Sequence, residues 1–277
     1  MAAAAFTFLA MIAFAGNSLL CRMALKTTAI DPTSFTTIRI VSGALTLWLI
    51  VRMRNASAAG EGNWLSAFAL FAYAAAFSFA YLSLTAATGA LILFGSVQVT
   101  MIGWGIRSGD RPGVWQITGV LCAFAGLVGL LLPGLSAPPL AGATLMMIAG
   151  VAWGAYSLRG RGAGDPTRVT AGNFLRAVAF SAALTLAMLP AMLLDAAGIA
   201  YAVASGALAS GVGYALWYSA LKHLGTTTAA TIQLSVPVLA AAGGIVFLGE
   251  ALTLRLAAAS AVILGGIAAA ILGAPRR

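Results

Sequence analysis

Uncharged, apolar stretches follow one another along the chain, and short polar connections separate them. Residues 62–106 and 112–158 contain no charged side chain. Because a helix needs about 20 residues to cross a bilayer, each of these stretches can hold two membrane spans. Apolar windows bounded by charge, proline or glycine predict ten spans, at residues 3–21, 34–51, 64–84, 89–106, 113–132, 140–158, 172–194, 197–220, 226–248 and 254–273. The pattern therefore predicts an all-α integral membrane protein.

The composition agrees with this pattern. Apolar residues make up 61% of the 277 positions and charged residues only 8%, whereas a soluble domain carries about 25% charge. The net charge of +9 is scattered over short connections, so nucleic acid is not expected as a partner. Cys21 and Cys122 lie in apolar stretches and give no framework for a disulfide or a metal site. The first apolar run extends to Cys21 without a basic segment before it, so we expect a first span rather than a cleaved signal peptide.

Basic residues are distributed unequally between alternate connections. One side of the membrane receives ten of them, namely Arg52, Arg54, Arg107, Arg111, Arg159, Arg161, Arg168, Lys222, Arg276 and Arg277. The other side receives three, namely Arg22, Lys26 and Arg255. Because cytoplasmic loops hold the excess of Lys and Arg, both termini are predicted to be cytoplasmic, as in a multi-pass protein of the bacterial inner membrane.

Short strings in the first half of the chain recur in the same order in the second half. The pairs are Asp31-Pro32-Thr33 with Asp165-Pro166-Thr167, Ala44-Leu45-Thr46-Leu47 with Ala183-Leu184-Thr185-Leu186, Ser96-Val97 with Ser235-Val236, Gly109-Asp110 with Gly249-Glu250, and Gly126 with Gly266. Their offsets of 134 to 140 residues predict two five-helix repeats, at 1–135 and 136–277. An odd number of spans inverts the second repeat, and inverted repeats are the architecture of many secondary transporters, with a substrate site between the halves.

Groups that carry catalytic chemistry are missing from the predicted spans. All six acidic residues and the single histidine lie in or beside connections. No paired carboxylates, metal-ligand cluster or Ser-His pair shares one level of the membrane, so we expect neither an enzyme nor a cofactor. A carboxylate-based proton pump is disfavoured for the same reason, because a proton relay needs a titratable group within the membrane.

Two arginines lie near the starts of corresponding spans, Arg39 in the second span and Arg176 in the seventh. The plain interpretation is that both snorkel to the interface or pair with loop carbonyls. The sharper one is that either residue meets the carboxylate of a substrate.

The fourth and ninth spans each combine a helix-bending residue with polar side chains. Gly95 precedes Gln98 in one, and Gln233 and Ser235 precede Pro237 in the other. Proline removes a backbone donor and bends a helix, so Gly95 and Pro237 are predicted hinges. The three polar side chains are predicted to line a cavity, although helix packing through their hydrogen bonds is an alternative explanation.

Further lining candidates come from other spans. Asn17 lies inside the first span, where a buried amide needs a partner. Tyr81, Trp153, Tyr156 and Tyr214 belong to aromatic clusters and are predicted to shape a substrate pocket, whereas interfacial belt positions are the plain alternative.

Three strings carry a family resemblance over nearly the whole chain. They are Ala15-Gly16-Asn17, Asp31-Pro32 followed by Arg39, and Pro237 followed by Leu248-Gly249-Glu250-Ala251-Leu252-Thr253. With them the chain resembles the drug/metabolite transporter superfamily, in particular the ten-helix exporters built from paired EamA domains. The first half departs from the pattern, because Gly95 stands where the family's proline would be expected.

The resemblance implies an exporter whose central cavity is lined by spans one, three, four, six, eight and nine, with spans five and ten at the periphery. The chain is most similar to the branch that exports aromatic and other neutral amino acids. We therefore expect a small-molecule exporter that works by alternating access, either facilitative or coupled. The alternatives are a proton antiporter for lipophilic cations, a membrane-embedded enzyme and a non-transporting scaffold. The oligomeric state stays open.

Overall fold

The computed structural model describes residues 2–54, 61–109, 113–134, 137–160, 164–221, 223–224 and 232–273. Within these residues, eight helices are long and apolar enough to cross a membrane, and two shorter apolar helices, Trp64–Ala80 and Ser235–Leu248, join them. These helices match the ten predicted spans in order, and the described part of the chain contains no strand. The prediction of an all-α membrane fold is confirmed.

The helices are α1 (Ala2–Thr27), α2 (Pro32–Met53), α3 (Trp64–Ala80), α4 (Ala86–Arg107), α5 (Val114–Leu131), α6 (Leu140–Arg159), α7 (Pro166–Ala187), η1 (Leu189–Ala191), α8 (Ala196–Val203), η2 (Ala204–Val212), α9 (Gly213–Leu221), α11 (Ser235–Leu248) and α12 (Leu254–Leu272). The eighth span is a continuous rod of α8, the π-helical segment η2 and α9. α3 ends before the predicted boundary at residue 84, and α7 begins and ends earlier than the predicted 172–194.

The recurring Asp-Pro-Thr strings explain where α2 and α7 begin. The Asp31 carboxylate accepts hydrogen bonds from the amides of Thr33 (2.8 Å) and Ser34 (3.0 Å), and Asp165 accepts one from the amide of Thr167 (2.9 Å). The proline that follows each aspartate has no amide to satisfy and a backbone angle suited to a first helical turn. The same local chemistry therefore starts the second helix of each predicted repeat.

Asp31 also fixes α2 to the segment after η1. Its other carboxylate oxygen accepts a hydrogen bond from the Leu193 amide (2.9 Å). Burial raises the pKa of Asp31, but the hydrogen bonds from Ser34 and from the backbone amides outweigh this effect, so the pKa lies below the usual range of an aspartate. The ionised carboxylate thus stabilises this junction.

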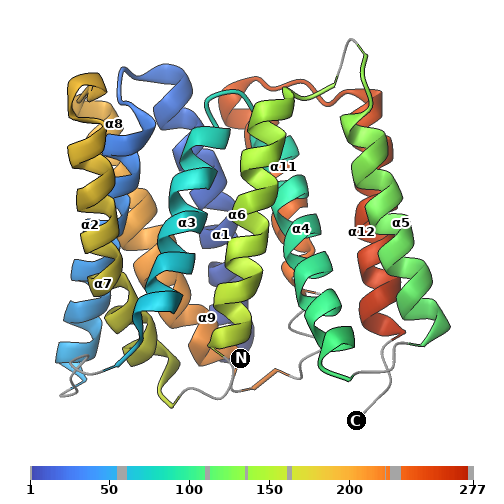
Figure 1. Cartoon of the computed structure of the whole chain (residues 1–277), viewed down its shortest axis with the longest axis horizontal. Coiled ribbons are helices and arrows are strands. Elements are labelled where there is room, and N and C mark those ends of the chain that lie inside the picture. The colour runs from blue at the N-terminus through green and yellow to red at the C-terminus, as the bar shows by residue number, and fades with distance from the viewer. Residues whose placement is uncertain are drawn as a thin grey trace.

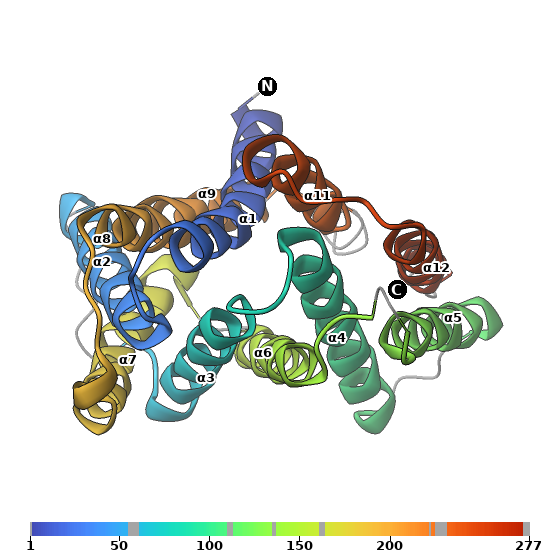
Figure 2. The ribbon, with the colours of Figure 1, turned by 90° about the horizontal axis from the view of Figure 1, so that it is seen from above.

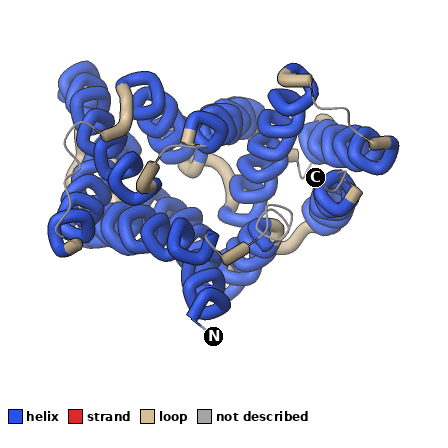
Figure 3. Tube along the Cα trace, turned by 90° about the horizontal axis from the view of Figure 1, so that it is seen from below, coloured by secondary structure: helices blue, strands red, loops and turns tan. Residues whose placement is uncertain are grey.

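Helix packing follows a two-fold pattern. α2 packs against α7, and α5 packs against α12. α6, the first helix of the second half, contacts α3 and α4 of the first half. In the same way α1, the first helix of the first half, contacts α9 and α11, which correspond to α3 and α4 in the second half. Seen along the helices, the α5–α12 pair lies to one side of the others (Figures 2 and 3). Gly119 and Gly266 permit this close contact, because an added Cβ on either would lie only 2.3 Å or 2.6 Å from the other's carbonyl oxygen.

The two ends of the bundle differ in charge. The start of α1 and the end of α12 lie at the same end (Figure 1). The last turns of α2, α4 and α6 and the first turn of α7 reach this end with the described residues Arg52, Arg107, Arg159 and Arg168. We call it the arginine-rich end and the other the opposite end. Five of the ten basic residues that the sequence assigns to this end, Arg111, Arg161, Lys222, Arg276 and Arg277, lie outside the described residues.

Candidate functional site

A cavity of about 510 Å³ lies between α1, α4, α6, α7 and α9. The residues that line it are Phe14, Val97, Gln98, Met101, Trp153, Tyr156, Ser157, Gly160, Pro166, Val169, Thr170, Asn173, Tyr214, Trp217, Tyr218, Leu224 and Gln233. Gly160 follows the last turn of α6 and Pro166 begins α7, so the cavity extends to the arginine-rich end. Its volume suits a small organic ligand. We call it the main cavity.

Aromatic rings and hydroxyl groups form much of the cavity wall. Trp153 stacks on Tyr156, with ring centroids 5.4 Å apart, and lies 5.3 Å from Tyr214. The Tyr156 hydroxyl donates to Thr170 Oγ1 (3.3 Å), and Thr170 Oγ1 donates to the Tyr218 hydroxyl (3.4 Å). The wall therefore offers apolar ring faces beside neutral hydrogen-bonding groups, and none of the described lining residues is acidic.

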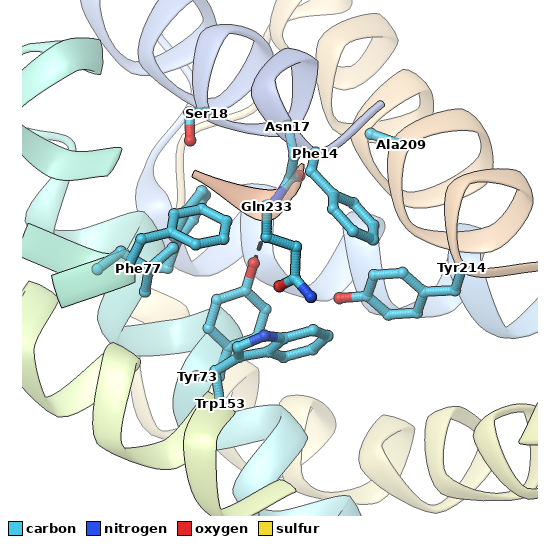
Figure 4. A pocket seen from close by; sticks show the side chains of 11 residues that line it. Phe14, Asn17, Ser18, Tyr73, Phe77, Trp153, Ala209, Tyr214 and Gln233 are labelled. Carbon is cyan, nitrogen blue, oxygen red and sulfur yellow. Dashed lines mark hydrogen bonds between the residues drawn. The ribbon is translucent and has the colours of Figure 1, made fainter. Parts of the chain in front are cut away.

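A smaller chamber of about 30 Å³ lies deeper in the bundle. Its lining residues are Phe14, Asn17, Ser18, Tyr73, Phe77, Leu93, Phe94, Trp153, Ala209, Tyr214 and Gln233. It shares the residues Phe14, Trp153, Tyr214 and Gln233 with the main cavity. Figure 4 shows the Gln233 side chain extending into this chamber, between Tyr73 and Tyr214. We call it the inner chamber, and it is the deep end of the main cavity.

A buried polar network forms one wall of the inner chamber. Asn17 donates from Nδ2 to the Tyr73 hydroxyl (3.2 Å) and accepts at Oδ1 from Ser205 (2.6 Å). Arg39 Nη2 donates to the same Tyr73 hydroxyl (3.1 Å), and Arg39 Nε donates to Ser210 (3.5 Å). The network joins α1, α2, α3 and η2 directly behind the chamber.

Arg39 is the large cation of this network, and only 2% of its surface is exposed. Its guanidinium lies over the rings of Tyr73 and Phe77, at 5.1 Å and 4.9 Å from their centroids. Its Nη1 has no hydrogen-bond partner among the residues that the structure describes. The ion pairs of the described residues are Arg22–Glu250 and Arg168–Glu61, so Arg39 forms none there.

At the opposite end, Glu250 ties three parts of the bundle together. Its carboxylate accepts hydrogen bonds from Arg22 Nε (3.2 Å) on α1 and from the Ala86 amide (2.8 Å) at the start of α4. Arg22 also donates to the carbonyl of Tyr81 (2.8 Å), and Lys26 donates to the carbonyl of Leu248 (2.9 Å). None of the lining residues of the main cavity belongs to these connections. We call this set of contacts the Glu250 latch.

The structure brings together most of the lining residues predicted from the sequence. Those beside the two cavities are Asn17, Gln98, Trp153, Tyr156, Tyr214 and Gln233. Tyr81 lies elsewhere, because α3 ends at Ala80 and places it within the Glu250 latch, where its hydroxyl donates to the Ala86 carbonyl (3.4 Å). Ser235 donates to the Ile232 carbonyl (2.7 Å) and lines neither cavity.

The two predicted hinges do not interrupt helices. α4 is continuous through Gly95, where an added Cβ would lie 3.6 Å from Ile263 of α12 rather than in the cavity. Pro237 is the third residue of α11, and the helical turn breaks at Leu234 before it. The amides of a first helical turn have no partner within the helix, so a proline there removes no helical hydrogen bond and causes no kink. Bending at either residue during transport stays a prediction.

Arg176 lies apart from the cavities. It donates to the carbonyls of Glu61 and Gly172, as expected for an arginine that pairs with a loop. Arg39 lies eight residues after Asp31. The residue eight positions after Asp165 is Asn173, which lines the main cavity. Arg176 lies three residues further along α7, nearly one helical turn beyond Asn173, so Arg39 and Arg176 do not hold matching positions in the two helices.

Several cavity residues were not selected from the sequence, including Phe14, Thr170, Asn173 and Tyr73. For Tyr73 a signal existed, since Tyr73, Phe77 and Tyr81 follow one another at four-residue intervals and share a helix face. For Asn173 the signal was its place in the repeated Asp-Pro-Thr register.

Comparisons with known proteins give consistent results. Residues 140–272 match the EamA-like transporter family. An uncharacterized protein of Pseudomonas aeruginosa is 58% identical over 271 residues, which cover 98% of this chain and 94% of that protein. The threonine/homoserine exporter RhtA of Salmonella typhimurium is 36% identical over 154 residues, which span 50% of this chain and about half (48%) of that exporter. A solved crystal structure, 22% identical, covers 99% of both chains with a TM-score of 0.71 and has the same fold.

Proposed function

Because the chain belongs to the EamA-like transporter family, within the drug/metabolite transporter superfamily, we propose that it exports neutral amino acids, aromatic ones included, across a bacterial inner membrane. It is a multi-pass membrane transporter and not an enzyme. The likeness of half the chain to a threonine/homoserine exporter supports an amino-acid substrate.

The chemistry of the main cavity carries the proposal. Its walls combine ring faces with neutral donors and acceptors such as Gln98, Asn173 and Gln233. A zwitterion with an apolar side chain finds both kinds of contact there. The buried Arg39 cation behind the inner chamber opposes entry of a second cation.

The shape of the cavity supports alternating access between the two predicted repeats. The main cavity reaches the arginine-rich end, which the positive-inside rule predicts to be cytoplasmic. The Glu250 latch holds the opposite end together. The paired contacts of α2 with α7 and α5 with α12 fit halves at 1–135 and 136–277 that rock against each other. Substrate then enters from the cytoplasm and leaves when the latch opens.

A lipophilic-cation antiporter is the second candidate, and the aromatic walls favour it, since rings attract quaternary ammonium ions. Such an antiporter needs a titratable acid to couple protons, and the described lining residues include none. We therefore propose transport that does not depend on a proton gradient.

The test is counterflow into liposomes that contain the purified chain, with and without a pH gradient. Radiolabelled neutral and aromatic amino acids are compared with radiolabelled tetraphenylphosphonium, a lipophilic cation. Saturable uptake of several amino acids, unchanged by the gradient, supports the proposal. Uptake of the cation alone, or of any substrate only with a gradient, would replace it with the antiporter.

A further inference from the structure

Arg39 is a buried cation, and no buried anion among the described residues balances it. An isolated charge in a low-dielectric interior destabilises the fold unless a partner compensates it. The two ring faces at 5.1 Å and 4.9 Å compensate part of this effect, since the quadrupole of an aromatic ring attracts a cation over its face. The unpartnered Nη1 shows that the compensation is incomplete in this conformation.

The acidic residues of the described part are all engaged at the ends of the bundle. Asp31, Asp165 and Asp195 cap α2, α7 and α8, Glu61 pairs with Arg168, and Glu250 pairs with Arg22. Asp31 is the acidic residue that caps the helix of Arg39. The two residues are eight positions apart, which is about 12 Å along the helix. The described chain therefore supplies no counter-ion to Arg39.

Tyr73 connects this cation to the inner chamber. Its hydroxyl oxygen accepts hydrogen bonds from Arg39 and Asn17, which leaves the Tyr73 proton to be donated elsewhere. Tyr73 and Asn17 both line the chamber (Figure 4). Donation from Arg39 makes the Tyr73 hydroxyl a stronger donor, because hydrogen bonds in a chain polarise one another. An anionic acceptor in the chamber would complete the network.

We propose that Tyr73 and Asn17 bind the carboxylate of the transported substrate and that Arg39 is the counter-ion behind them. This inference rests on the proposed function. The inner chamber, at about 30 Å³, has room for a group the size of two waters and not for a whole amino acid. Only the carboxylate enters it, and the rest of the substrate lies in the main cavity against Trp153 and Tyr214. Substrates of this transporter are then carboxylates, and the corresponding primary amides are much poorer substrates.

The experiment compares acids with their primary amides in the reconstituted full chain. Counterflow is measured for L-phenylalanine and L-threonine and for L-phenylalaninamide and L-threoninamide. The wild-type protein is expected to take up at least one acid with a KM at least tenfold below that of its amide, because a hydrogen bond to a charged group contributes about 1.5–3 kcal/mol.

Arg39→Gln and Tyr73→Phe are the test variants. Both are expected to raise the KM for the acid about tenfold or more and to leave that for the amide unchanged. Tyr73→Phe keeps both rings beside Arg39, so it tests the subsite independently of whether Arg39→Gln folds. Arg176→Gln, which removes an arginine held by loop carbonyls, is the matched control and should keep wild-type discrimination.

The outcomes separate the two proposals. If the wild-type protein takes up acid and amide equally, or if folded Tyr73→Phe retains full discrimination, the carboxylate subsite is wrong while amino-acid transport stands. If the wild-type protein takes up neither acid, the proposed amino-acid function fails, and the subsite fails with it. A purely structural Arg39 would change the uptake of acid and amide by the same factor.

Discussion

Neutralising Glu250 should open the end of the transporter that this structure holds closed. Glu250→Gln keeps the size of the side chain and removes its charge. The side chains of Arg22 and Glu250 are only 13% and 5% exposed, so solvent screens their attraction little. The substitution leaves an acceptor for the Ala86 amide and weakens the link between α1 and the connection before α12.

The magnitude follows from the bonds that are lost and kept. A hydrogen bond between charged groups contributes about 1.5–3 kcal/mol, and each 1.4 kcal/mol changes a population tenfold. Arg22 keeps its bonds to the carbonyls of Tyr81 (2.8 Å) and Leu82 (3.2 Å), so the closed end is weakened rather than abolished. We expect the form open at the opposite end to become about 10- to 100-fold more populated.

The assay is labelling of a cysteine at residue 18. Ser18 lines the inner chamber and is 2% exposed, so it is shielded when the latch is closed. Ser18→Cys is made in a Cys21→Ala, Cys122→Ala background, and a membrane-impermeant maleimide is applied from the face that carries Lys26. Glu250→Gln is expected to accelerate labelling by about 10-fold or more, in proportion to the open population.

Glu61→Gln is the matched control, because it breaks the other described ion pair. The side chains of Arg168 and Glu61 are 35% and 31% exposed, and exposed pairs contribute only about 0–1 kcal/mol. Its labelling rate should stay near that of the parent. Equal rates in Glu250→Gln and Glu61→Gln, with both proteins folded, would refute the role of the Glu250 latch.

Two further predictions concern stability, measured by thermal unfolding in detergent. Gly119→Val should destabilise the protein by about 1–3 kcal/mol, because its side chain would collide with the Gly266 backbone. Gly129→Val is the matched control and should not destabilise it, because a Cβ added at Gly129 would lie more than 4 Å from the other described parts of the bundle. Equal melting temperatures would contradict the close α5–α12 contact. Asp31→Ala should cost about 1 kcal/mol at neutral pH through loss of the cap. The lowered pKa of Asp31 means that its contribution is present above the unfolded pKa of about 3.9 and is lost as pH falls through the folded value, so variant and wild type should converge in acid. A difference that persists unchanged in acid would contradict this sign.

The sequence was sufficient to predict the spans and most of the cavity because membrane burial leaves a strong pattern. Long uncharged runs located the helices, and buried amides such as Asn17 and Gln98 stood out against an apolar background. Six of the eight predicted lining residues lie beside the two cavities. A polar side chain in a span needs a partner or a cavity, so its position is informative.

Depth along a helix was harder to predict than the face of a helix. The sequence places Tyr73 and Tyr81 on one helix face, and the apolar window gave no reason to end α3 at Ala80, before Tyr81. Its end depends on the turn that follows, whose carbonyls are held by Arg22 from a distant part of the chain. The isolation of Arg39 likewise depends on where every carboxylate of the fold lies, and local pattern carries no such information.

If substrate crosses through the cavity between the two halves, a matched pair of tryptophan substitutions should separate cavity from surface. Trp153 joins both cavities, whereas Trp115 on α5 is 71% exposed on the surface of the bundle. Counterflow of radiolabelled L-phenylalanine and L-threonine is measured for Trp153→Ala and Trp115→Ala in liposomes. Trp153→Ala is expected to lose most saturable uptake while Trp115→Ala retains it. Full uptake by Trp153→Ala, in a protein that is folded and reconstituted like the wild type, would show that substrate does not cross through this cavity.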